Sequence, residues 1–148
     1  MSEHGDNVWA DLEEIGEGVR GVRLRRTPGR PLAAAVWELE PGSAGVPYHF
    51  HHGTEELLVV LRGRPLLRGP DGERELAEGE VVHFPPGPDG AHSLSNPTAE
   101  LVRYLMVGAH ASPDVVEYPD EGAFAAFART ASQRGTPFSV RLPLPPEA

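Results

Sequence analysis

Two reactive residue types are missing from this chain of 148 residues. It contains no cysteine, and it contains no lysine because all 13 of its basic residues are arginine. Without cysteine there is no disulfide, zinc–thiolate centre or thiol nucleophile. Without lysine, Schiff-base catalysis and a P-loop are excluded. Basic charge is scarce as well, and 22 acidic residues bring the net charge to −9. That charge repels nucleic acid and anionic lipid, so we expect no nucleic-acid partner.

Long apolar runs are also missing. No segment approaches the ~18 consecutive apolar residues of a membrane-spanning helix. The N-terminal sequence MSEHGDNVWADLEE is polar and acidic, unlike a secretory signal or a transit peptide. We therefore expect no membrane association and a cytoplasmic location. The length is typical of one domain with a substantial core.

Glycine and proline are abundant, at 17 and 16 residues. They gather in turns between short apolar or alternating segments, which favours an all-β antiparallel sandwich or barrel. The predicted strands are Gly18–Arg25, Leu32–Leu39, Glu56–Leu61, Pro65–Arg68, Arg74–Leu76, Val81–Phe84 and Glu100–Val107. No helix of useful length is expected between residues 18 and 110.

The pattern changes after Pro119. Asp120 can cap a helix, and the apolar residues that follow have the i, i+3, i+4, i+7 spacing of one helix face. These residues are Phe124, Phe127, Ala128 and Ala131. The spacing predicts a short C-terminal helix on the outside of the sheet, followed by an extended segment over 136–144.

A cluster of possible metal ligands precedes the most apolar predicted strand. His49 and His51 are two residues apart, so on a strand both imidazoles lie on the same face. The turn Gly53-Thr54 follows, and Glu56 opens the returning strand, where its carboxylate can meet both imidazoles. If the sheet closes, His92 completes a cluster of three histidines and one glutamate.

Such a cluster suits one divalent transition metal, either Mn, Fe, Co, Ni, Cu or Zn. The lack of thiolate argues against a purely structural zinc site. Four protein ligands on an ion that accepts about six leave two adjacent positions open. A diol, hydroxy-ketone or keto-acid fits those positions, as does one substrate atom together with O₂. With a single glutamate the site carries about one positive charge, which favours an anionic ligand.

The same residues resemble the first cupin motif, G-x5-H-x-H-x(3,4)-E-x6-G. His49, His51, Glu56 and Gly63 fit it, while the leading glycine, Gly42, stands one residue too early.

The second cupin motif, G-x5-P-x-G-x2-H-x3-N, is also present. It matches Gly79, Pro85, Gly87, His92 and Asn96, with two extra residues between Gly87 and His92. Because side chains on a strand alternate every two residues, an insertion of two lengthens the loop and leaves His92 on the same face.

The resemblance implies a double-stranded β-helix, or jelly-roll barrel, with a metal near one end of its interior. It implies one cupin domain over 1–148, with a barrel core at about 32–107, an N-terminal arm at 1–17, and the C-terminal helix and tail at 113–148. The segment Glu117–Asp120 resembles the end of many small bacterial cupins, sometimes labelled mannose-6-phosphate-isomerase-like.

Other polar residues near the motifs are assigned different roles. Glu55 is the alternative carboxylate, but Glu56 keeps the six-residue spacing to Gly63. Arg103 lies in the middle of an apolar strand, where it either pairs with an acid on the outer sheet face or points inward toward an anionic ligand. Asn96 is interpreted as a turn residue. The histidines expected outside the ligand set are His4, His52, His83 and His110, although His52, like Glu55, could act as an acid or base.

We expect a metal-dependent protein with a small-molecule ligand, and an enzyme is favoured. One reading is an isomerase or epimerase in which the metal polarises a carbonyl or enediolate. The alternatives are an Fe, Mn or Ni dioxygenase and a non-catalytic binding module. The cupin resemblance also implies a homodimer. A two-fold interface would cover the apolar row at the C-terminal strand edge, which consists of Phe138, Val140, Leu142 and Leu144.

Overall fold

The computed structural model describes residues 7–24, 31–128 and 138–145, and within them the chain folds into strands that form three antiparallel sheets. The largest sheet consists, in spatial order, of β1 (Glu13–Gly16), β2 (Val19–Arg23), β3 (Leu32–Leu39), β10 (Val102–Ala109), β5 (Glu55–Arg62) and β8 (Val81–Phe84). A second sheet has the order β13 (Phe138–Pro143), β12 (Ala123–Ala128), β11 (Asp114–Tyr118) and β4 (Phe50–His51). The third has the order β7 (Gly72–Glu75), β6 (Leu66–Gly69) and β9 (Ser93–Ser95).

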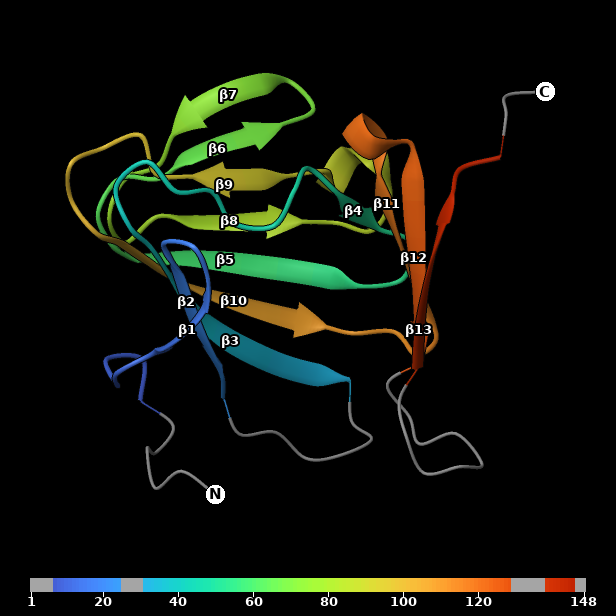
Figure 1. Ribbon diagram of the computed structural model, residues 1–148, viewed down its shortest axis with the longest axis horizontal. Helices are drawn as coiled ribbons and strands as arrows, with labels where there is room; N and C mark the ends of the chain where they lie inside the picture. Colours follow the sequence, from blue (N-terminus) through green and yellow to red (C-terminus); the bar gives the residue numbers. More distant parts are fainter. Residues whose placement is uncertain (1–6, 25–30, 129–137, 146–148) are drawn as a thin grey trace.

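The three sheets enclose one interior. Figure 1 shows β11, β12 and β13 standing across the ends of the horizontal strands, while β6, β7 and β9 lie on the side of β8. The architecture is the all-β jelly roll that the sequence predicts, although the described sheets do not join into one closed barrel. Two of the described connections contain one-turn 3-10 helices, at Pro88–Gly90 and Pro119–Glu121.

The apolar core fills one end of this interior. On β5 the inward side carries Leu58 and Val60, both almost fully buried, and on β10 it carries Val102 and Tyr104. Alternation puts Glu56 on the same inward face as Leu58, two residues nearer the other end. The core therefore ends where the polar cluster begins, and it holds that cluster on rigid strands.

The predicted C-terminal helix is wrong. Residues Ala123–Ala128 form β12, which pairs along its whole length with β13 on one side and, over residues 123–127, with β11 on the other. The turn Pro119–Glu121 ends at Gly122, whose φ of 56° is left-handed, and the chain then becomes extended. Two neighbouring strands satisfy the backbone hydrogen bonds of this segment, which outweighs the helical spacing of its phenylalanines and alanines. Ala131 lies outside the described residues.

Most strand predictions are confirmed over the described residues. Leu32–Leu39 and Val81–Phe84 coincide with β3 and β8, and β2 lies within the predicted 18–25 segment, whose last residue is not described. The predicted N-terminal arm contains β1, which pairs with β2. No helix in the described part of the chain is long and apolar enough to cross a membrane.

Arg103 adopts the first of its two predicted arrangements. Its Nη1 donates to Glu38 Oε1 at 2.7 Å, and both residues are buried and directly opposite one another on β10 and β3. The guanidinium also donates to the carbonyl of Ala10 and lies 5.8 Å from the ring centroid of Trp9. The N-terminal segment thus supplies one further acceptor to the buried guanidinium, whose Nε has no hydrogen-bond partner among the described residues.

Candidate metal site

His49 and His51 come from a short strand segment that crosses the interior. The backbones of His49 and His92 form a two-way bridge, with N···O distances of 3.1 and 2.9 Å. This bridge places the two imidazoles opposite one another, and their ring centroids are 4.6 Å apart. On its other side the segment pairs with β11, where His51 is opposite Val116. Pairing on both sides is what turns His49 and His51 toward the interior.

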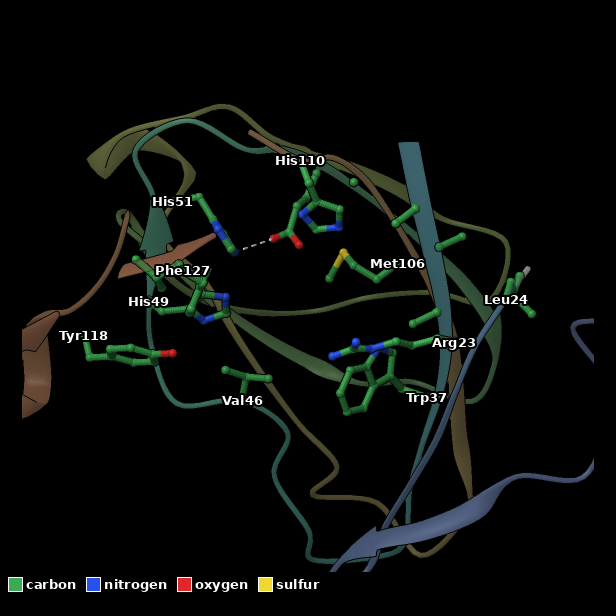
Figure 2. A pocket seen from close by; sticks show the side chains of 16 residues that line it. Arg23, Leu24, Trp37, Val46, His49, His51, Met106, His110, Tyr118 and Phe127 are labelled. Carbon is green, nitrogen blue, oxygen red and sulfur yellow. Dashed lines mark ion pairs between the residues drawn. The ribbon is translucent and has the colours of Figure 1, made fainter. Parts of the chain in front are cut away.

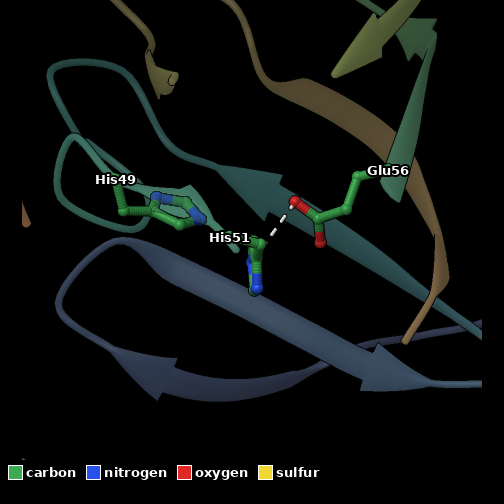
Figure 3. Close-up of side chains that lie close together, drawn as sticks. All are labelled: His49, His51 and Glu56. Atoms are coloured by element: carbon green, nitrogen blue, oxygen red, sulfur yellow. Dashed lines mark ion pairs between the residues drawn. The ribbon is translucent and has the colours of Figure 1, made fainter. Parts of the chain in front are cut away.

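Three of the predicted ligands have their donor atoms close together. The ligand atoms of His49, His51 and Glu56 all lie within 4.8 Å of one another, and all three residues are buried (Figure 3). His92 stands beside them, and Glu56 Oε2 is 3.5 Å from Nε2 of both His51 and His92. His49, His51 and Glu56 thus form the group whose ligand atoms are all mutually close, and His92 adjoins it through the Glu56 carboxylate.

Hydrogen bonds fix the direction of the imidazoles. Nδ1 of His49 lies 2.8 Å from the carbonyl oxygen of Pro47, and Nδ1 of His92 lies 2.8 Å from that of Gly90. A carbonyl only accepts, so each Nδ1 carries the proton and each Nε2 keeps its lone pair. The His92 ring is further held by stacking on Phe84, at 3.8 Å between centroids.

His51 is held in the same tautomer by a carboxylate. Its Nδ1 donates to Asp114 Oδ2 at 2.8 Å, and the same carboxylate accepts from Thr54 Oγ1 at 2.5 Å and from the Gly53 amide at 3.0 Å. Burial raises the pKa of Asp114, but the hydrogen bonds from His51 and Thr54 outweigh it and bring that pKa below its ordinary value. Asp114 is therefore ionised, which strengthens the electron donation of His51 through Nε2.

Burial also keeps two of the imidazoles neutral. It lowers the pKa of His49 from 6.5 to about 4 and that of His92 to about 3, with further lowering from the neighbouring histidines. A histidine must be neutral to bind a metal ion. Both rings are thus in the binding-competent state at neutral pH before any ion arrives.

The cluster opens into a cavity of about 230 Å³. Its walls are mainly apolar and include Trp37, Met106, Tyr118 and Phe127, so β3, β10, β11 and β12 all contribute (Figure 2). A smaller cavity of about 80 Å³ adjoins His49 and Glu56 and is also lined by His92. Apolar walls around a few convergent polar groups are the usual composition of a small-molecule site.

The other histidines near the motif lie on the surface. Nε2 of His52 is 2.8 Å from Glu117 Oε1, and that of His83 is 2.5 Å from Glu55 Oε1. His52, Glu55 and His83 are all exposed, which agrees with the prediction that His52 and His83 lie outside the ligand set. Asn96 is a structural turn residue, because its side chain bonds to the carbonyls of Leu39 and Glu100. His4 is outside the described residues.

Two residues near the cluster were not singled out from the sequence. His110, predicted outside the ligand set, is not among the clustered ligand atoms, but it lines the same cavity as His49 and His51 (Figure 2). It follows β10 two residues after the inward-facing Gly108, so alternation could have found it. Asp114 was not singled out. No local pattern joins it to His51, from which it is 63 residues distant in sequence.

Comparison with known proteins identifies the fold family. A family model described as "Cupin domain" matches residues 35–108, half of the chain. Among solved structures, a putative sugar phosphate isomerase from Acidithiobacillus ferrooxidans is 32% identical with a TM-score of 0.63, covering 75% of this chain and 67% of that one. A sugar phosphate isomerase of the cupin superfamily from Silicibacter pomeroyi has a TM-score of 0.73 at 23% identity, covering 88% and 82%, which shows the fold alone.

A third solved structure is the polyketide cyclase RemF from Streptomyces resistomycificus. It is 26% identical with a TM-score of 0.54, and the match covers 62% of this chain and 65% of that one. No curated protein matches. With both motifs in order, a jelly-roll architecture and a family model that spans the site, the chain belongs to the cupin domain family.

Proposed function

We propose that this cupin binds one divalent transition metal through His49, His51, Glu56 and His92. The observation that carries the proposal is the common direction of the imidazoles. Each has its Nδ1 proton engaged by an oxygen acceptor, and Nε2 of His51 and of His92 is 3.5 Å from the Glu56 carboxylate. Nitrogen and oxygen donors without thiolate suit Mn, Fe, Co, Ni, Cu or Zn.

We further propose that the protein is an enzyme of the isomerase or epimerase type, acting on a small ligand with adjacent oxygen functions. When bound, the metal would act as a Lewis acid toward a carbonyl or enediolate. The putative sugar phosphate isomerase that is 32% identical supports a ligand of this chemistry. The cavity of about 230 Å³ supports a small one, since drug-sized sites have roughly 300–1,000 Å³.

The chain's own side chains would support such a reaction in two ways. Trp37, Met106 and Phe127 line the cavity and would exclude water from the reacting atoms. His110 lines it as well, and an imidazole outside the ligand set suits proton transfer between neighbouring atoms of the ligand.

The experiment has two steps. Protein purified without chelator or metal-affinity resin is analysed for its elements. It is then incubated with aldose and ketose phosphates while their interconversion is followed by NMR. We expect one metal per chain and interconversion that stops after removal of the metal and returns on its addition. Iron or manganese with O₂ consumption would indicate a dioxygenase instead, and no metal after reconstitution would indicate a non-catalytic binding module.

We also propose a homodimer that uses the C-terminal strand. β13 is the edge of its sheet, with β12 as its partner in the described part of the chain. Val140 and Leu142 are 43% and 47% exposed on it. An exposed apolar edge strand favours pairing with a second copy, and a two-fold interface would cover both edges at once.

A further inference from the structure

A cationic side chain lines the cavity together with the metal cluster. Arg23, the last residue of β2, contributes to the same lining as His49, His51 and Glu56. Figure 2 shows its side chain extending from β2 into the space that the histidines face. We propose that Arg23 binds an anionic group of the ligand, a phosphate or a carboxylate, while the metal cluster binds the oxygen functions at the ligand's other end.

The pairing of strands in the largest sheet gives the distance between the two ends of this cavity. Arg23 is opposite Ala35 on β3, Ala35 is opposite Met106 on β10, and Met106 is opposite Leu58 on β5. Three strand spacings of ~4.8 Å put β2 about 14 Å from β5. Glu56 is two residues from Leu58 and on the same face. Arg23 and Glu56 therefore face one interior from opposite sides, at a separation that a sugar-sized ligand can bridge.

The charge of Arg23 is not matched within the described residues. No ion pair of Arg23 occurs there, whereas nearly every other described arginine has an acidic partner. Arg62 is the other exception. Both arginines are exposed, but Arg62 stands at the far end of β5 and does not line the cavity, whereas Arg23 does. Arg23 is therefore available to an anionic group of a ligand in the cavity.

The lining between the two ends leaves room for that ligand. Ala33, Ala35 and Gly108 contribute little side-chain volume on the path from Arg23 to the cluster. Trp37 borders the space and packs toward Gly21, where an added Cβ would be 3.3 Å from its ring. The guanidinium of arginine matches two oxygens of a phosphate or carboxylate at once. We thus infer an acidic ligand, such as a sugar phosphate or sugar acid, which rests on the proposed function for its metal-bound end.

A matched set of probes tests the inference. Glucose 6-phosphate, glucuronate and glucose share one carbon skeleton and carry a phosphate, a carboxylate or a hydroxyl at the sixth carbon. Binding of each is measured by NMR titration to the wild type, to Arg23→Gln, and to Arg62→Gln as the control. We expect the wild type to bind one of the two anions at least tenfold more tightly than glucose. Arg23→Gln should lose most of that preference and leave the glucose affinity within about twofold, while Arg62→Gln should keep it. The anion that is preferred identifies phosphate or carboxylate as the group.

Equal anion preference in the wild type and Arg23→Gln overturns the inference, as does a wild type that prefers neither anion over glucose. Metal content is measured on the same samples, and the titrations are repeated on His49→Ala/His51→Ala. A wild type that takes up no metal when metal is added, yet keeps the Arg23-dependent preference, would retain the anion site and refute the proposed metal function. Full metal content together with no effect of Arg23→Gln on binding would support the proposed metal function and refute the anion site.

Discussion

Nδ1 of His51 lies 2.8 Å from Oδ2 of Asp114, across 63 residues of sequence. This contact decides which nitrogen of His51 faces Glu56, because the proton is held on the side of the carboxylate. Asp114 also accepts from Thr54 and from the backbone of Gly53, so the turn before β5 and the start of β11 are joined at the site. Asp114 thus acts as a positioning residue for a predicted ligand.

Asp114→Asn should weaken metal binding by about 10- to 100-fold. An asparagine whose amide nitrogen faces His51 donates instead of accepting, which favours the other tautomer and puts a proton on Nε2. The measurements are metal affinity by calorimetry and the ¹⁵N chemical shifts of His51. Thr54→Val is the control, because it removes one bond to Asp114 and keeps the carboxylate. Equal affinity in Asp114→Asn and wild type, with unchanged shifts, would contradict this role.

His51→Ala should lower metal occupancy sharply, and the melting temperature in the presence of metal should fall with it. A ligand that binds only the native state stabilises it by mass action, so a lost ligand residue removes that gain. Elemental analysis and thermal unfolding measure the two effects. His52→Ala is the control and should keep its metal, since His52 is exposed and bonded to Glu117. Full occupancy in His49→Ala/His51→Ala would refute the ligand set.

The metal-free protein should lose stability as the pH falls below 6.5. The folded pKa values of His49 and His92, about 4 and about 3, lie below the ordinary 6.5. Between pH 6.5 and about 4 the unfolded chain therefore binds protons that the folded chain does not. Each histidine then lowers the free energy of unfolding by about 1.4 kcal/mol per pH unit at most.

Denaturant unfolding in chelator at pH 7.5, 6.5 and 5.5 measures this loss. His92→Gln removes one of the two rings whose pKa is lowered by burial, so its free energy of unfolding should fall less steeply over the same range. His52→Gln, at an exposed histidine, should follow the wild type. A slope that is identical in wild type and His92→Gln would show that burial does not hold His92 neutral.

Gly63→Ala should destabilise the fold far more than Gly42→Ala. Both glycines have left-handed φ angles, 80° and 81°. A Cβ at Gly63 would be 2.7 Å from the carbonyl oxygen of Leu101, whereas one at Gly42 would meet nothing within 4 Å. Strain alone should make Gly42→Ala cost about 1 kcal/mol, and strain with a backbone clash should make Gly63→Ala cost roughly 3 kcal/mol or more. Denaturant unfolding of the pair compares them, and equal costs would refute the clash.

Light scattering on the full chain should give twice the 16.0 kDa mass of one chain. Val140→Asp/Leu142→Asp places two charges on the exposed edge strand β13 and should yield monomers, because burying them in an interface is costly. Val81→Asp, at a 55% exposed valine on the edge strand β8, should remain dimeric. A monomeric wild type rules out the homodimer, and a dimeric double variant rules out the role given to β13.

The sequence by itself was sufficient for the features that depend on short spacings. Two-residue alternation put His49 and His51 on one face, and the six-residue spacing to Gly63 selected the inward Glu56 over the outward Glu55. Glycine and proline marked the turns, so β3 and β8 were predicted to the residue and the all-β fold was confirmed. Each of these follows from the local period of a strand and the backbone freedom of a turn.

The tertiary structure decided whatever depends on which strands become neighbours. The apolar spacing after Asp120 fits a helix, yet β12 is extended because β11 and β13 supply hydrogen bonds on both of its edges. Asp114 reaches His51 only because β11 pairs with β4, and Arg23 shares a cavity with Glu56 only because β3 and β10 lie between their strands. These contacts join residues far apart in the chain, and strand pairing, which local pattern does not encode, brings them together.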